Sequence, residues 1–144
     1  MAFTIASLAI RFIAGKASDQ YGRIRVIKIG LILLAVSLFV IALGDSFSGL
    51  MLGAVSYGIA VGVLSPALNA WTIDMSLPDH RGKAMATMYI ALEAGIGLGA
   101  LFAGWYYQDV IATIPVVMYA SAAITIVALS YMFLRTKKPA AAPL

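Results

Sequence analysis

Four apolar segments, each long enough to cross a lipid bilayer, constrain this chain more than any other feature. They cover residues 26–43, 50–72, 84–105 and 113–134, and only short polar turns separate them. About 20 apolar residues in a helix span the hydrocarbon core of a membrane. Because lipid offers no hydrogen-bond partner to an open backbone, such segments cross as helices. The sequence therefore predicts an all-α fold, a polytopic transmembrane helical bundle with four full spans.

A shorter apolar run, residues 1–14, precedes these segments and contains Arg11. At about 1.5 Å per residue it is roughly 21 Å long, whereas the hydrocarbon core is about 30 Å thick. We interpret this run as a truncated N-terminal helix, the cytoplasmic part of a fifth span. The alternative is a helix that lies at the membrane interface. The bundle then covers residues 1–138, and residues 139–144 are expected to form a disordered tail.

Composition excludes several classes of protein. Of the 144 residues, 62% are hydrophobic and only 11% are charged, against about a quarter charged in soluble domains. The net charge of +4 does not indicate nucleic-acid binding, because the basic residues form short clusters between apolar runs. The chain has no cysteine and no metal-spaced pair of histidines. We therefore expect no catalytic residues, no metal site and no cofactor, and interpret the chain as a non-enzyme.

The basic residues also predict how the chain is oriented. Apart from Arg11, they lie in the turn after the first run, in the turn at 74–83 and at the C-terminal end. The turns at 44–49 and 106–112 contain none. Cytoplasmic turns of membrane proteins are enriched in Lys and Arg, so we expect a multi-pass protein of the plasma or inner membrane with a cytoplasmic C-terminus. These residues are Lys16, Arg23, Arg25, Lys28, Arg81, Lys83, Arg135, Lys137 and Lys138.

The first basic turn contains a recognisable motif. Its residues follow the spacing G-x-x-x-D-x-x-G-R, which resembles the cytoplasmic loop of the major facilitator superfamily of transporters. Arg25 comes one place late, because Ile24 occupies the usual basic position. The matching residues are Gly15, Asp19, Gly22 and Arg23, with Lys16 as a common addition.

The second basic turn and the helix after it extend this resemblance over nearly the whole chain. The pattern is similar to the C-terminal half of the family, about helices eight to twelve, in drug/proton antiporters. One departure is that Ala100 follows Gly99, where antiporters often have Gly-Pro in the corresponding N-terminal-half helix. The residues that carry this part of the resemblance are Asp74, Pro78, Arg81, Gly82, Ala84, Gly95, Gly97, Gly99 and Gly104.

The resemblance implies a conformational role for the charged turns. In the family, the aspartate at the position of Asp19 locks the outward-facing state against the eleventh helix, which here begins near Gly82. A carboxylate suits a helix N-terminus, because free N–H groups and the helix dipole favour an anion. The alternative is a solvated turn residue. The family also implies that Arg23 pairs with Asp74, although Arg81 competes for Asp74 by proximity.

The remaining residues of these turns have simpler expected roles. Gly15 and Gly22 permit a close backbone approach or a positive φ. Lys16 and Arg25 are interpreted as charges that fix the orientation of the chain in the membrane.

Glu93 is the main candidate for binding a proton or a solute. It lies near the middle of the span 84–105, where an unpaired carboxylate is costly, so it is expected to face a cavity or to carry a proton. The alternative is a neutral Glu that hydrogen-bonds to a neighbouring helix. Asn69 and Tyr57 are candidates for lining the same cavity, or else for joining helices through polar contacts.

Together these features predict transmembrane transport of small solutes by a facilitator-type secondary transporter. The chain corresponds to about five of the family's twelve helices, and we expect that it does not transport alone. The expected partners are the lipid bilayer, a small-molecule solute with proton coupling, and an N-terminal half-transporter chain; nucleic acid is excluded. The alternative is a non-transporting accessory or structural membrane protein, or half of a split transporter.

Overall fold

The computed structural model describes residues 10, 18–44, 46–107 and 113–135. Within these residues the chain is helical and contains no strand. The predicted first helix, apart from Ile10, lies outside the described residues, as do Gly15, Lys16 and the tail at 139–144. The elements are α2 (Arg23–Ala42), α3 (Phe47–Asp74), the short 3-10 helix η1 (Pro78–His80), α4 (Arg81–Tyr107) and α5 (Ile114–Arg135).

The four long helices are each long and apolar enough to cross a membrane. The predicted all-α bundle with four full spans is therefore confirmed. Three helices begin a few residues before the predicted spans, at Arg23, Phe47 and Arg81. Hydropathy marks only the part of a helix that suits lipid, whereas the backbone stays helical into the polar region beyond it.

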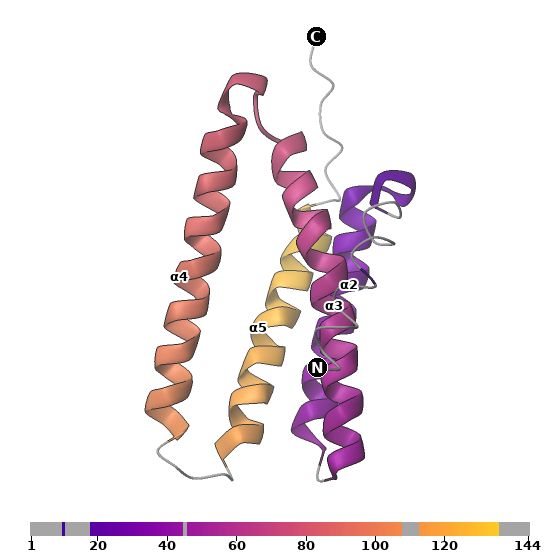
Figure 1. Cartoon of the computed structure of the whole chain (residues 1–144), viewed down its shortest axis with the longest axis vertical. Coiled ribbons are helices and arrows are strands. Elements are labelled where there is room, and N and C mark those ends of the chain that lie inside the picture. The colour runs from indigo at the N-terminus through magenta and orange to yellow at the C-terminus, as the bar shows by residue number, and fades with distance from the viewer. Residues whose placement is uncertain (1–9, 11–17, 45, 108–112, 136–144) are drawn as a thin grey trace.

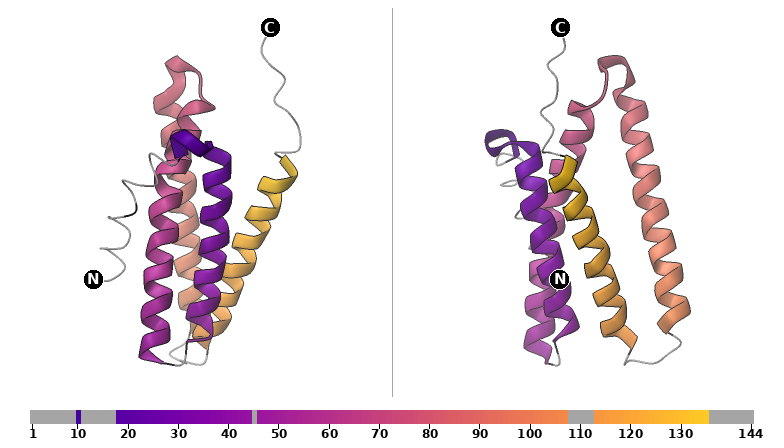
Figure 2. Two further views of the ribbon diagram at one scale, coloured as in Figure 1. Left: turned by 90° about the vertical axis from the view of Figure 1, so that its right-hand side faces the viewer. Right: turned by 180° about the vertical axis from the view of Figure 1, so that it is seen from behind.

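Helix α2 is the centre of the packing and contacts both α3 and α5, as the views in Figures 1 and 2 agree. A Cβ added to Gly30 of α2 would lie 2.8 Å from Cγ of Leu64 in α3, so the absence of a side chain lets these two helices approach closely. The buried cluster between α2, α3 and α5 consists of Val26, Ile27, Leu64, Ala67 and Met132.

Helix α4 stands apart from the other three over most of its length (Figure 1). None of its residues is buried. It contacts α3 close to the connecting turn, where the Thr72 Oγ1 lies 3.1 Å from the Sδ of Met88. A Cβ added at Gly95, Gly97 or Gly99 would meet nothing within 4 Å. The middle of α4 therefore has no packing partner among the described residues.

The two ends of the bundle differ in their turns. At one end, Ser46 caps α3, because its Oγ accepts a hydrogen bond of 3.2 Å from the N–H of Gly49. At the other end, α3 connects through η1 to α4, and the start of α2 lies at this same end (Figure 1). Both basic turns of the sequence thus lie at one end of the molecule, as the charge pattern predicts.

Candidate functional site

Arg23 joins two parts of the chain that are far apart in sequence. Its Nε donates a hydrogen bond of 2.7 Å to Oδ2 of Asp74, and its Nη1 pairs with Oδ1 of Asp19 at 2.5 Å. The Arg23 side chain is 28% exposed, against 65% for Asp19 and 49% for Asp74. One guanidinium therefore bridges two carboxylates at the end of the bundle where η1 lies. We call these three residues the Arg23 cluster.

The positions of these residues in their helices explain why they pair. Arg23 is the first residue of α2 and Asp74 is the last residue of α3. The helix dipole repels a cation at a helix N-terminus and an anion at a helix C-terminus, so each of these charges is unfavourable when it is unpaired. Because α2 and α3 are antiparallel neighbours, the two unfavourable ends meet, and the ion pair offsets both. The planar guanidinium presents several donors and can serve two carboxylates together.

Gly22 separates the helical residues 18–21 from α2. Its φ is 88°, a left-handed conformation in which a side chain is strained. This is one of the two roles expected for Gly22 from the sequence. The break brings Asp19, four residues before Arg23, to the same guanidinium.

The structure brings together the predicted pair Arg23 and Asp74, and in the part of the chain that it describes Asp74 has no ion pair with Arg81. Asp19 is bound to Arg23 and makes no hydrogen bond to the N-terminus of α4 within those residues. Its docking there stays a prediction. Gly82 and Arg25 are exposed.

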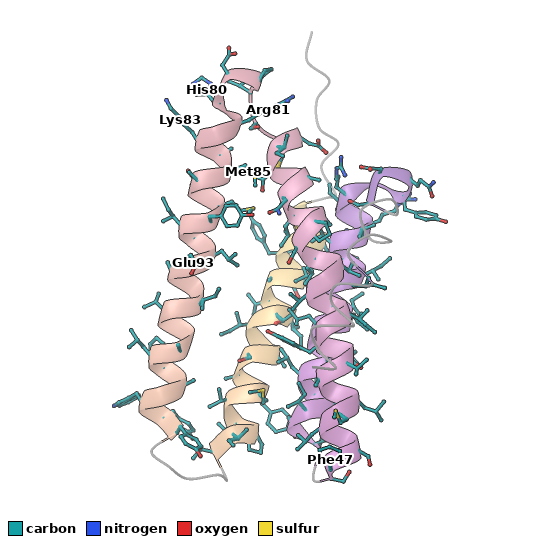
Figure 3. The ribbon with its side chains drawn as sticks, viewed as in Figure 1. Phe47, His80, Arg81, Lys83, Met85 and Glu93 are labelled. Atoms are coloured by element: carbon teal, nitrogen blue, oxygen red, sulfur yellow. The ribbon has the colours of Figure 1, made fainter. Side chains whose placement is uncertain are left out.

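Glu93 lies near the middle of α4, the helix that stands apart (Figure 3). Its side chain is exposed, and Gly97 on the following turn leaves open space beside it. In a helix of membrane-spanning length this places a carboxylate at the depth of the hydrocarbon core, on a helix without a packed partner there. Figure 3 also shows Arg81 and Lys83 at the other end of the bundle from Phe47.

Tyr57 lines a groove formed by α2, α3 and α5. The groove has a volume of about 430 Å³ and lies towards the end of the bundle where α5 begins. We call it the α5 groove. Asn69, the other predicted cavity residue, is half-buried on α3 and does not line it. The lining residues are Leu34, Leu38, Ile41, Tyr57, Met118, Ser121 and Thr125.

Ser121 and Thr125 were not predicted from the sequence. Each hydroxyl donates 2.9 Å to the carbonyl four residues earlier, Ser121 to Val117 and Thr125 to Ser121. In a helix, residues four apart lie on one face. A pair of hydroxyl residues at this spacing in an apolar span is the signal that would have identified them.

The chain matches the family model described as Major Facilitator Superfamily over residues 1–144. Three findings indicate the same family: the helical spans, the ion pair between the ends of α2 and α3, and this match. The chain belongs to the major facilitator superfamily of membrane transporters.

Two curated relatives are similar to this chain over part of their own length. The quinolone resistance protein NorA of Staphylococcus aureus is 33% identical over 104 residues, which cover 72% of this chain and 27% of that protein. Multidrug resistance protein 1 of Bacillus subtilis is 29% identical over 133 residues, covering 92% of this chain and 34% of the relative. The chain thus spans about a third or less of the relatives that it matches.

Proposed function

We propose that the chain is the C-terminal part of a secondary transporter that exports drug-like small solutes, and that it works only together with an N-terminal part. Family membership supports transport, and the printed names of the relatives, quinolone resistance and multidrug resistance, support the solute class. The observation that carries the proposal is the Arg23 cluster, in which Arg23 of the family-type turn bridges Asp19 and Asp74.

The cluster has a mechanical role in this proposal. Transporters of this kind expose a central site to each side of the membrane in turn by rocking of their halves. Arg23 fixes the turn before α2 to the end of α3, so the two move together. Asp19 is thereby held at the cytoplasmic surface, and in the outward-facing state it docks against the N-terminus of α4 or against the N-terminal part.

Glu93 carries the coupling proton in this proposal. A carboxylate in the hydrocarbon core is stable when it is protonated or faces a cavity. The isolated helix α4 leaves Glu93 exposed, and an N-terminal part that covers α4 would enclose it. The orientation with a cytoplasmic C-terminus in the plasma or inner membrane belongs to the same proposal, because it brings the Arg23 cluster to the inner side.

A second candidate is a non-transporting accessory membrane protein, or one half of a split transporter. It is favoured by the fact that α4 contains no buried residue. In a complete transporter every membrane helix has partners, so this open helix is either covered by a separate chain or exposed to lipid.

Reconstitution separates a part of a transporter from a non-transporting accessory protein. The chain is placed in liposomes alone, and in parallel with the portion of the Bacillus subtilis relative that it does not match. Proton-driven uptake of a quinolone is then measured. We expect no transport by the chain alone and transport with both parts. Uptake by the chain alone, or none with a complementing part that demonstrably binds it, would contradict the proposal.

Glu93→Gln in the reconstituted pair tests the proton site. We expect coupled flux to be lost while assembly and solute exchange persist, because Gln keeps the shape of Glu without its ionisation. Ser130→Ala, which removes an exposed hydroxyl on α5, serves in the same preparation as a check that coupling depends on position 93 and not on any polar residue. Unchanged coupling in Glu93→Gln would exclude the role of Glu93 but not the transport function.

A further inference from the structure

We propose that the α5 groove binds an uncharged aromatic molecule that donates a hydrogen bond. This rests on the proposed function, since it names a solute class for the same transporter. Binding to the 144-residue chain can nevertheless be measured without transport.

The size and charge of the groove restrict its ligand first. Its volume of about 430 Å³ lies within the range of roughly 300–1,000 Å³ that is usual for small-molecule sites. None of its lining residues in the described part of the chain is charged. A charged group would be desolvated there without a partner, so the bound part of the ligand is neutral.

The hydroxyl groups restrict the ligand further. Ser121 and Thr125 each have one proton, and both protons are already donated to carbonyl oxygens of α5. A hydroxyl oxygen that donates its proton still has lone pairs to accept with. The two side chains therefore offer acceptors to the groove, and a ligand that donates a hydrogen bond can use them. Thr125 is 9% exposed, so this acceptor is shielded from competing solvent.

The apolar walls favour an aromatic ring. Tyr57 supplies a ring from α3, and Met118 supplies a polarisable sulfur from α5. Beside the groove, Phe39 of α2 contacts Tyr119 of α5 with ring centroids 5.8 Å apart. This contact holds α2 and α5 together beside the site. The groove thus combines flat apolar surface with two directed acceptors.

A matched pair of probes tests the requirement for a donor. 1-Naphthol has an O–H, and 1-methoxynaphthalene is a similar ring without one. Equilibrium dialysis against the chain in nanodiscs measures each, with empty nanodiscs as the blank. We expect saturable binding of 1-naphthol, and binding about five- to tenfold weaker for 1-methoxynaphthalene, the usual effect of losing one hydrogen bond. Equal binding of both probes, or no saturable component, would overturn the proposal.

Matched variants then locate the site. Thr125→Val keeps the shape of the side chain and removes its acceptor. We expect it to weaken 1-naphthol about five- to tenfold and to leave 1-methoxynaphthalene unchanged. Thr87→Val is the control, because Thr87 makes the same bond to a carbonyl, that of Lys83, on exposed α4. Equal effects of the two substitutions on 1-naphthol would exclude the groove.

A serine pair on α5 gives a second comparison. Ser121→Ala removes the other acceptor in the groove, whereas Ser130→Ala removes an exposed hydroxyl with the same type of backbone bond. Only Ser121→Ala is expected to weaken 1-naphthol. Loss of binding in these variants together with intact transport by the reconstituted pair would leave the groove as a binding site but exclude it as the site of the transported solute. Intact binding with no transport would refute the proposed function alone.

Discussion

At the scale of single residues, Arg23 has the most distinctive position, because it bridges two carboxylates from different parts of the chain. Partly exposed ion pairs contribute little, about 0–1 kcal/mol each. We expect a double-mutant cycle of Arg23→Ala and Asp74→Asn to give a coupling free energy of about 0.5–1 kcal/mol. Unfolding of the chain in mixed micelles, followed by circular dichroism, measures it.

The control is Arg25→Ala combined with Asp74→Asn. Arg25 belongs to the same turn but is exposed and has no ion pair within the described residues, so its coupling is expected to be near zero. Raising the salt concentration to about 1 M screens exposed charges and should reduce the Arg23 coupling. A coupling equal to that of Arg25 would mean that the pair contributes nothing to folding.

At the scale of helices, two glycines that look alike in sequence are expected to respond oppositely to alanine. A Cβ at Gly30 would lie 2.8 Å from Leu64 Cγ, within the buried cluster, whereas a Cβ at Gly97 would meet nothing within 4 Å. We expect Gly30→Ala to destabilise by about 1–3 kcal/mol through overpacking. Gly97→Ala should stabilise α4 slightly, by up to about 1 kcal/mol, because Gly is a poor helix former.

Unfolding free energies of both variants in the same micelles measure this difference. Equal destabilisation would mean that α4 packs against protein in the isolated chain. In the reconstituted pair Gly97→Ala serves a second purpose: if an N-terminal part covers this face, the substitution should weaken assembly there while leaving the isolated chain stable.

The helices themselves followed from the sequence, because lipid enforces helical backbone wherever an apolar run is long enough. Their ends did not, since residues such as Arg23 and Asp74 are polar but helical. The separation of α4 was not predicted either. Hydropathy reports how well a helix suits lipid, and it is the same for a lipid-facing helix as for one that faces a missing partner.

At the scale of the whole molecule, contacts between residues far apart in sequence were harder to predict than the helices were. The pairing of Arg23 with Asp74 was expected from the family resemblance, because no spacing rule relates residues at the ends of two different helices. Tyr57 was a candidate on its polarity alone, whereas its groove partners Ser121 and Thr125 were missed. Their hydroxyls lie in an otherwise apolar span, and whether they line a groove depends on which helix packs opposite them.

The orientation of the bundle is the property on which the cytoplasmic role of Arg23 and Asp19 depends. Because the chain contains no cysteine, single cysteines can be introduced without any background. Ser48 and His80 are both exposed. Ser48 follows Phe47, which Figure 3 shows at the end of the bundle opposite His80. The turn that contains Ser48 has no Lys or Arg, whereas the turn that contains His80 has Arg81 and Lys83. The positive-inside rule therefore places Ser48 outside and His80 inside.

In intact cells a membrane-impermeant maleimide should label Ser48→Cys and reach His80→Cys only after permeabilisation. Labelling of His80→Cys in intact cells would put the Arg23 cluster on the outer surface, where Asp19 and Arg23 have no role in closing an inner gate, while leaving the fold and the α5 groove unaffected.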